Sequence, residues 1–105
     1  MFQNLQRMRI IAKSVLVNYY LKNEKAKTPL ELWYRETKKA NWYNFSDIKN
    51  TFNSVDSIGN QHYVFNIKGN DFRLIVVVKF TIQTVLIRFI GTHKEYDKIK
   101  NINTF

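Results

Sequence analysis

The chain has 105 residues, which fits one domain spanning residues 1–105, with residues 1–7 and 100–105 as flexible ends. Hydrophobic residues make up 45% of the chain, which excludes wholesale disorder. The absence of cysteine excludes disulfides, thiol nucleophiles and cysteine-based metal sites, and no apolar run approaches the ~20 residues of a membrane span. Seventeen Lys and Arg against eight Asp and Glu give a net charge of +9, which predicts attraction to nucleic acid, an anionic membrane or an acidic protein.

The N-terminal part of the chain predicts a strand followed by a helix. Residues 9–12, Arg-Ile-Ile-Ala, favour a short strand. Apolar residues then recur with the spacing of one helix face, which indicates a helix over about residues 14–22: Val15, Leu16, Tyr19 and Tyr20.

A second helix is predicted over residues 28–39. Thr28 stands at an N-cap position, Pro29 at the first helical position and Glu31 at the third, which is the pattern of a capping box. A stripe with helical spacing follows and should face the core: Leu30, Trp33, Tyr34 and Thr37. Residues 47–52 favour a further short turn of helix.

From residue 62 the apolar period changes to two, which predicts a meander of three antiparallel strands over about residues 62–67, 72–80 and 85–90. A second capping box, from Thr92 to Glu95, starts a short helix through about Ile99. This order indicates the α+β class, with an N-terminal strand and two helices packed on an antiparallel meander, and a short C-terminal helix.

The turns between these strands set which residues face each other. If residues 69–70 form the whole first loop, Asn66 lies opposite Arg73. If residues 82–83 form the second loop, Arg73 comes level with Thr92, beside the start of the last helix.

The alternation divides the sheet into two faces. One is entirely apolar and must pack on the helices, with Tyr63, Phe65, Ile67, Phe72, Leu74, Val76, Val78, Phe80, Val85, Ile87 and Phe89. The other mixes polar and basic with apolar side chains, namely His62, Asn66, Lys68, Arg73, Lys79 and Arg88 among Val64, Ile75, Val77, Leu86 and Ile90. An open, basic face fits a phosphate backbone, although simple solvation of Lys79 and Arg88 explains those two residues equally well.

Two groups of side chains are candidates for chemistry. Arg73 lies in an otherwise apolar strand, near Asn66 and near a helix N-terminus that would stabilise an anion. His93, Tyr96 and Asp97 have i, i+3 and i+4 spacing, so they share one helix face, where histidine as a residue type suits proton transfer near neutral pH. Such triplets also occur by chance, and simple packing accounts for Tyr96 as well.

Two long segments carry a resemblance to a known family. They read FNIKGNDFRLI at residues 65–75 and FIGTHKEYDKI at residues 89–99, and the middle section adds Trp33-Tyr34, Ala40-Asn41-Trp42 and Asp47-Ile48. Over about residues 8–99 the chain resembles the HigB family of toxins from type II toxin–antitoxin systems.

The resemblance implies a RelE-like fold and an mRNA interferase, an endoribonuclease that cleaves mRNA on the translating ribosome and inhibits translation and growth. It also implies a HigA-type helix-turn-helix antitoxin as partner, with the toxin–antitoxin complex binding its own operator DNA. We expect a cytoplasmic protein with no membrane partner, because the start of the chain lacks the pattern of a secretory signal.

The expected reaction is attack of a ribose 2′-OH on the adjacent phosphate, without a metal or cofactor. The predicted catalytic residues are Arg73, which matches the family's arginine and would stabilise the transition-state charge, and His93, Tyr96 and Asp97 in the C-terminal motif. His93 would act as acid or base, and Tyr96 as a second proton donor or a base-stacking surface. The predicted RNA-binding residues are Asn66, Lys68, Lys79, Arg88, Lys94 and Lys98.

Two other functions use the same features. A non-catalytic RNA-binding or ribosome-binding domain would bind RNA and leave it intact. An interaction module with a basic surface for an acidic partner would show no salt-dependent RNA affinity.

Overall fold

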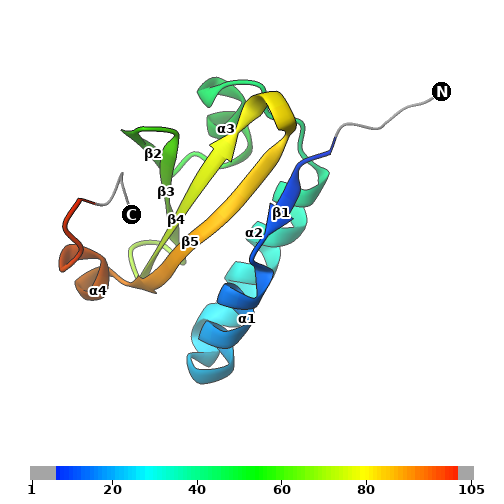
Figure 1. The fold of residues 1–105 in the computed structure, drawn as a ribbon. Coiled ribbons are helices and arrows are strands. Elements are labelled where there is room, and N and C mark those ends of the chain that lie inside the picture. The colour runs from blue at the N-terminus through cyan, green and yellow to red at the C-terminus, as the bar shows by residue number, and fades with distance from the viewer. Residues whose placement is uncertain (1–6, 102–105) are drawn as a thin grey trace.

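The computed structural model describes residues 7–101, and its elements follow an α+β order (Figure 1). The strands are β1 (Arg9–Ile11), β2 (Val55–Gly59), β3 (His62–Ile67), β4 (Phe72–Lys79) and β5 (Thr84–Thr92). The α-helices are α1 (Lys13–Lys22), α2 (Lys27–Lys39), α3 (Phe45–Thr51) and α4 (His93–Asp97), with 3₁₀ turns at Glu24–Ala26 and Phe80–Ile82. The predicted α+β class is confirmed, and so are the predicted N-terminal strand and the three helices that follow it. The flexible ends predicted at residues 1–7 and 100–105 lie largely outside the described residues.

The five strands of the described chain form one sheet in the order β1-β5-β4-β3-β2. Strands β2 to β5 pair antiparallel with their chain neighbours, and β1 pairs parallel with β5. The predicted meander of three strands is therefore one strand short. The missed strand, β2, lies at the edge and carries a bulge between Ser57 and Gly59, and a bulge interrupts the alternation that identifies a strand in a sequence.

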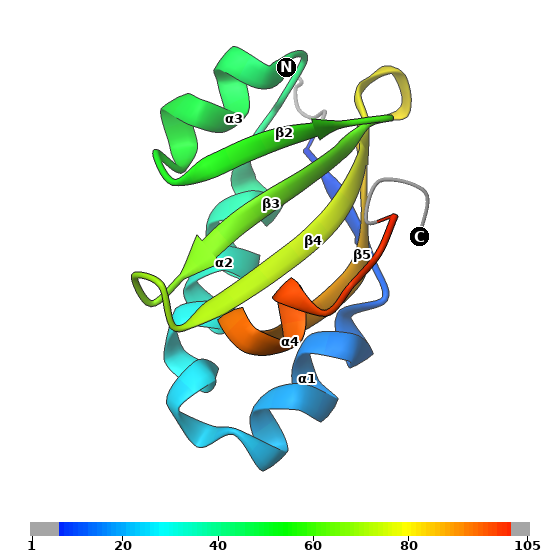
Figure 2. The ribbon, with the colours of Figure 1, turned by 90° about the vertical axis from the view of Figure 1, so that its left-hand side faces the viewer.

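Helices cover one face of this sheet, which we call the inner face. Figure 2 shows α2 behind the strands and the short α4 in front of them. Side chains buried on the helices pack with the inner face, among them Leu16, Leu30, Trp33 and Ile48. Within residues 7–101 no helix is both long enough and apolar enough to cross a membrane.

The start of α2 differs from the prediction. Ala26 is the N-cap, no side chain caps the helix, and Thr28 already lies in the first turn. The reason is that the 3₁₀ turn at Glu24–Ala26 leads directly into α2, so the chain enters the helix before the predicted capping box. The predicted stripe is correct, because Leu30, Trp33 and Thr37 are buried.

The β3–β4 hairpin has the predicted register but a longer loop. Asn66 lies opposite Arg73, as expected, and pairing ends at Ile67 opposite Phe72, so the loop has four residues, 68–71. Positive φ angles of 54° and 64° occur at Lys68 and Gly69. The prediction of a two-residue loop at residues 69–70 is therefore wrong. A two-residue loop and the observed four-residue loop give the same strand register, so the predicted pairing is still correct.

The β4–β5 register differs from the prediction. Lys79 lies opposite Thr84, because a 3₁₀ turn followed by Gln83 in the left-handed region connects the strands. The Gln83 side chain donates hydrogen bonds to the backbone oxygens of Trp42 and Phe80, at 2.6 and 3.1 Å, which fix this turn. Arg73 consequently lies opposite Gly91 and not Thr92.

A β-bulge further along β5 changes which side chains face the core. Val76 lies opposite Ile87 and Ile75 opposite Phe89, so β5 carries one extra residue, Arg88, between them. Beyond the bulge the alternation is reversed. Ile90 is buried in the core, and Phe89, predicted for the inner face, lies outside that core cluster. The other strand residues predicted for the apolar face are in the core or packed against it.

Aromatic rings fill the core between α2, α3 and β3. The rings of Trp42 and Phe65 stack with their centres 6.3 Å apart, and Phe52 contacts both edge-on, at 6.1 and 5.4 Å. The indole Nε1 of Trp42 donates to the Thr51 hydroxyl at 3.0 Å, and its backbone N–H donates to the Met8 sulfur at 3.4 Å. Trp42 therefore connects the end of α3 and the start of β1 to the sheet.

Replacing Trp42 should destabilise the fold strongly. We expect Trp42→Ala to lower the free energy of unfolding by about 3–5 kcal/mol, because it leaves a cavity among the aromatic rings of the core. The neighbouring Tyr43 is 58% exposed, so Tyr43→Ala should change that free energy by about 0.5 kcal/mol or less. Urea denaturation followed by fluorescence measures both, and similar losses in the two variants would contradict this account of the core.

Candidate nucleic-acid interface

The face of the sheet opposite the inner face contains three of the predicted site residues, Asn66, Arg73 and Lys79, and we call it the outer face. Its members include His62, Val64 and Asn66 on β3, Arg73, Ile75, Val77 and Lys79 on β4, and Leu86, Phe89 and Gly91 on β5. The middle of the face is apolar and buried at Val64, Ile75 and Val77. Polar groups are therefore concentrated toward the two ends of the strands, and α4 lies at one of these ends (Figure 2).

The start of α4 has the predicted capping box. The Thr92 hydroxyl accepts from the Glu95 N–H at 3.1 Å, and the Glu95 carboxylate accepts from the Thr92 N–H at 2.7 Å. The His93 N–H also donates to the Asp71 backbone oxygen at 3.3 Å, which ties α4 to the β3–β4 loop. The helix ends at Asp97, two residues before the predicted end. These contacts fix α4 beside the Arg73 end of the sheet.

Arg73 is the cation at the centre of this region. It pairs across the sheet with Asn66 and Gly91, and its guanidinium carbon lies 5.8 Å from the centre of the Tyr96 ring. Its Nη1 is buried and has no hydrogen-bond acceptor within residues 7–101. Buried donors are almost always paired in folded proteins, so this guanidinium has the capacity to bind an additional acceptor such as a phosphate oxygen.

The ring of Tyr96 lies against that cation. Burial raises the pKa of Tyr96 above its usual value, the positive charge of Arg73 lowers it, and the carboxylates of Asp56 and Asp97 raise it. The balance is a raised pKa, so the phenol keeps its proton at neutral pH and can donate a hydrogen bond or a proton.

His93 and Asp97 form a pair on α4. The His93 Nδ1 lies 3.0 Å from a carboxylate oxygen of Asp97, one turn later in the helix, and both side chains are about half exposed. A carboxylate at Nδ1 orients the ring and leaves Nε2 for contact with a ligand. Within residues 7–101, no three side chains of His, Asp or Glu gather closely enough to hold a metal ion.

The predicted RNA-binding residues are spread over the molecule. Asn66 donates to the Ser54 hydroxyl at 2.6 Å, and Lys68 forms an exposed ion pair with Asp71 at 3.2 Å, both near the Arg73 end. Lys79 bonds to the Gln61 side chain at the other end of β4. Lys79 lies six positions after Arg73 in β4, which is about 20 Å at roughly 3.3 Å per residue. The structure therefore does not bring Lys79 together with the Arg73 group.

Three further basic side chains predicted to bind RNA are exposed. Arg88 occupies the bulge position of β5, while Lys94 lies on α4 and Lys98 directly follows it. Lys94 and Lys98 therefore place positive charge on α4, which begins at His93, and directly after it.

Sequence reasoning missed three residues of this region. Phe89 was assigned to the core, because the alternation contains no signal for the bulge at Arg88. A Cβ atom on Gly91 would lie only 2.5 Å from the Phe89 ring, so the absence of a side chain at Gly91 lets that ring lie over the strand beside Arg73. Asp56 acts on the charge state of Tyr96 from β2, the strand that was not predicted.

Comparisons with known proteins identify the family of this chain. A family described as HigB toxin, the RelE-like toxic component of a toxin–antitoxin system, matches residues 26–99. The mRNA interferase toxin HigB of Escherichia coli K12 is 34% identical over 92 residues, which cover 86% of this chain and 88% of that protein. The mRNA interferase HigB of Shigella flexneri has the same identity and coverage. The mRNA interferase HigB of E. coli O6:H1 is 27% identical over 94 residues, 88% of this chain and 91% of that protein.

The α+β order of the described elements is compatible with the class of RelE-like toxins that this family description names. Because the matches cover most of the chain, the particular family within this class is known: the chain belongs to the HigB toxin family. The family resemblance inferred from residues 65–75 and 89–99 is confirmed.

The charges around Tyr96 predict opposite effects of two substitutions on its pKa. Arg73→Gln should raise the pKa of Tyr96 further, because it removes the positive charge that favours the phenolate. Asp56→Asn should lower it, because it removes a negative charge that opposes ionisation. An NMR titration of ¹³C-labelled tyrosine, assigned with Tyr96→Phe, measures both shifts, and shifts of the same sign would show that these charges do not act on Tyr96 as described.

Proposed function

We propose that this chain is the toxin of a type II toxin–antitoxin system and acts as an mRNA interferase, an endoribonuclease that inhibits translation and growth. The observation that carries the proposal is Arg73, whose buried Nη1 donor lies on the outer face beside Tyr96. Membership of the HigB toxin family and the mRNA interferase names of the relatives support RNA as the substrate. The net charge of +9 favours a polyanionic substrate as well.

The proposed reaction is attack of a ribose 2′-oxygen on the adjacent phosphorus. The bond from phosphorus to the 2′-oxygen forms and the bond to the 5′-oxygen breaks, leaving a 2′,3′-cyclic phosphate and a free 5′-hydroxyl end. Negative charge grows on the non-bridging oxygens in the transition state, and the Arg73 guanidinium would stabilise it without reorganisation. Arg73 thus takes the electrostatic part that a metal ion plays in other nucleases, so the scheme needs no metal or cofactor.

Proton transfer in this scheme needs one acceptor and one donor. His93, held by Asp97 at 3.0 Å, would accept the proton of the 2′-hydroxyl. Tyr96 remains protonated because its pKa is raised, and it would donate to the leaving 5′-oxygen or stack on a base. Asp97 acts as a positioning residue in this assignment, since its carboxylate contacts His93.

The other proposed contacts are with the RNA backbone and with partners. Asn66, Lys68, Lys94 and Lys98 surround the Arg73 end, and Lys79 and Arg88 would hold RNA farther along the outer face. We place the reaction in the cytoplasm on the translating ribosome. A HigA-type helix-turn-helix antitoxin would neutralise the toxin, and their complex would bind its own operator DNA.

The cleavage proposal is tested by expression of the wild type and of a double variant, Arg73→Ala with His93→Ala. We expect the wild type to arrest growth and to create new mRNA 5′ ends that carry a free hydroxyl, and the double variant to do neither. With purified protein and translating ribosomes, Arg73→Ala alone should slow cleavage about 10²- to 10³-fold, the usual effect of removing one preorganised charge donor.

Lys25→Ala is the matched control, because Lys25 is exposed on the 3₁₀ turn before α2 and should leave cleavage unchanged. Circular dichroism confirms that each variant folds. Cleavage by folded Arg73→Ala at the wild-type rate would refute the assigned role. Growth arrest with intact mRNA would indicate a non-catalytic ribosome-binding or RNA-binding protein instead.

Backbone contacts predict a salt-dependent affinity for RNA. Lys68→Ala should weaken binding of a 2′-O-methyl RNA, which cannot be cleaved, and should reduce the slope of log affinity against log salt by about 1. Fluorescence anisotropy at several salt concentrations measures the slope. An unchanged slope would remove Lys68 from the RNA-binding surface.

A further inference from the structure

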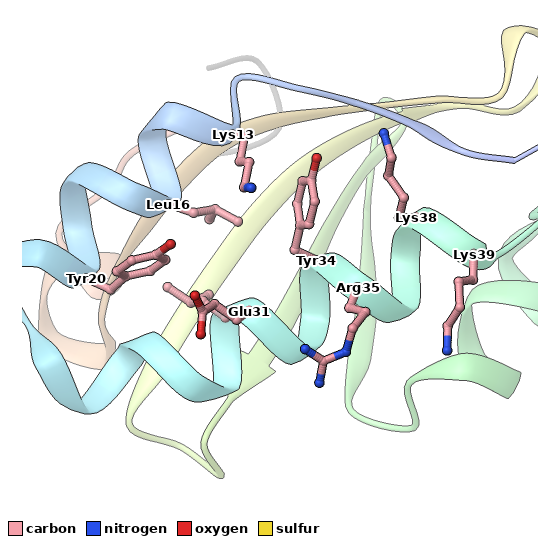
Figure 3. Close-up of a pocket in the computed structure, with 9 residues that line it drawn as sticks. Lys13, Leu16, Tyr20, Glu31, Tyr34, Arg35, Lys38 and Lys39 are labelled. Atoms are coloured by element: carbon pink, nitrogen blue, oxygen red, sulfur yellow. The ribbon is translucent and has the colours of Figure 1, made fainter.

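The first two helices leave a cavity between them that the proposed reaction does not use. It has a volume of about 390 Å³ and lies between α1 and α2 (Figure 3). These helices lie on the opposite side of the sheet from α4 (Figure 1). We call this cavity the helix groove and define it by its lining: Lys13, Leu16, Tyr20, Leu30, Glu31, Tyr34, Arg35, Lys38 and Lys39.

The helix groove combines an apolar base with a basic margin. Leu16 and Leu30 are buried at its base, and Tyr20 and Tyr34 are half-buried beside them. Four of the lining residues are basic and exposed, whereas Glu31 is the single acidic one. This composition fits a ligand that has an apolar side chain flanked by negative charges.

Only some of the positive charges at the margin of the helix groove have interaction partners within the described chain. Lys13 lies over the Tyr34 ring, with Nζ 4.5 Å from the ring centre, and Lys39 pairs with Glu36 at 3.3 Å. Figure 3 shows Tyr34 between Lys13 and Lys38. Within residues 7–101 Arg35 and Lys38 form no ion pair, so both charges are available to a partner.

A protein segment fits the helix groove better than RNA does. A phosphate chain needs a continuous track of cations, and here it would meet Glu31 in the lining and an apolar base that offers it nothing. An amphipathic helix carries apolar side chains on one face and carboxylates beside them, which matches both parts of the groove. A partner protein follows from the family, which is the toxic component of a toxin–antitoxin system.

We propose that the helix groove binds an acidic, amphipathic segment of the antitoxin. An apolar side chain of this segment packs against Leu16 and Tyr34, and its carboxylates face Arg35 and Lys38. The proposal rests on the proposed function for the existence of the antitoxin, but it concerns residues that take no part in cleavage. It separates the surface that anchors the antitoxin from the surface that binds RNA.

The test uses charge reversal on the full-length toxin. The probe is the purified HigA-type antitoxin of the proposed function, which we expect a neighbouring open reading frame to encode, and its affinity is measured by isothermal titration calorimetry. We expect the double variant Arg35→Glu with Lys38→Glu to bind this protein at least about tenfold more weakly, because like charges now face each other. The matched control is Lys22→Glu with Lys25→Glu, which reverses two exposed charges outside the groove and should change the affinity about twofold or less.

A growth experiment separates failure of this proposal from failure of the proposed function. When the double variant Arg35→Glu with Lys38→Glu, the groove variant, is expressed without the antitoxin, it should arrest growth and cleave mRNA like the wild type. When each toxin is expressed together with the antitoxin, only the groove variant should still arrest growth.

Unchanged affinity in the groove variant, equal losses in both double variants, or no binding of the antitoxin to the wild type would overturn the proposal. Loss of affinity for 2′-O-methyl RNA with unchanged antitoxin binding would overturn it too, in favour of RNA as the occupant. If neither the wild type nor any variant arrests growth, the interferase function is refuted. The calorimetric result still decides whether the antitoxin binds in the helix groove.

Discussion

The pairing of β4 with β5 determines where the proposed reacting groups lie. Strand β5 runs into α4 without a loop, because Thr92 is both the last residue of the strand and the N-cap of the helix. Any change of register between β4 and β5 would therefore move α4 relative to Arg73. The apolar side chains of the inner face oppose such a change, since a shift of one residue would turn those of the shifted strand away from the helices and toward the outer face. The bulge at Arg88 is the one place within residues 7–101 where the β4–β5 register shifts, and it rotates the end of β5 that leads to the site.

The positive charge of this protein is divided between two sides of one sheet. On one side, Arg73, Lys94 and Lys98 accompany a phenol and an imidazole, which suits an anionic substrate that must react. On the other side, Arg35 and Lys38 accompany apolar side chains, which suits a partner that must stay bound. The high net charge alone does not distinguish these uses. The groups beside each cation do, because a cation next to acid–base side chains and a cation next to a hydrophobic cavity favour different ligands.

Much of the fold could be predicted from the sequence, because periodicity depends on local physics. The stripe of α2, the β3–β4 register and the capping box at Thr92 all follow from spacings of four residues or fewer, or from one hairpin. Some errors came from local irregularities, such as the 3₁₀ turn before α2 and the bulge in β2, and the error in the β4–β5 turn came from a contact between distant parts of the chain. The β4–β5 turn depends on Gln83 bonding to Trp42, 41 residues earlier, and alternation could not show the bulge at Arg88. The candidate site shows the same division. The His93–Asp97 pair follows from helix geometry, whereas Phe89 and Asp56 needed the bulge and the missed strand.

The two edges of the sheet also affect whether the protein aggregates at high concentration. A long, flat edge strand invites another chain to add to it, and the apolar β4 would be dangerous in that position. Here β4 lies third of five strands, while the edges are β1, with three residues, and β2, which is interrupted by its bulge and carries the exposed Asp56. The same irregularity that hid β2 from sequence analysis therefore protects the folded chain against edge-to-edge aggregation.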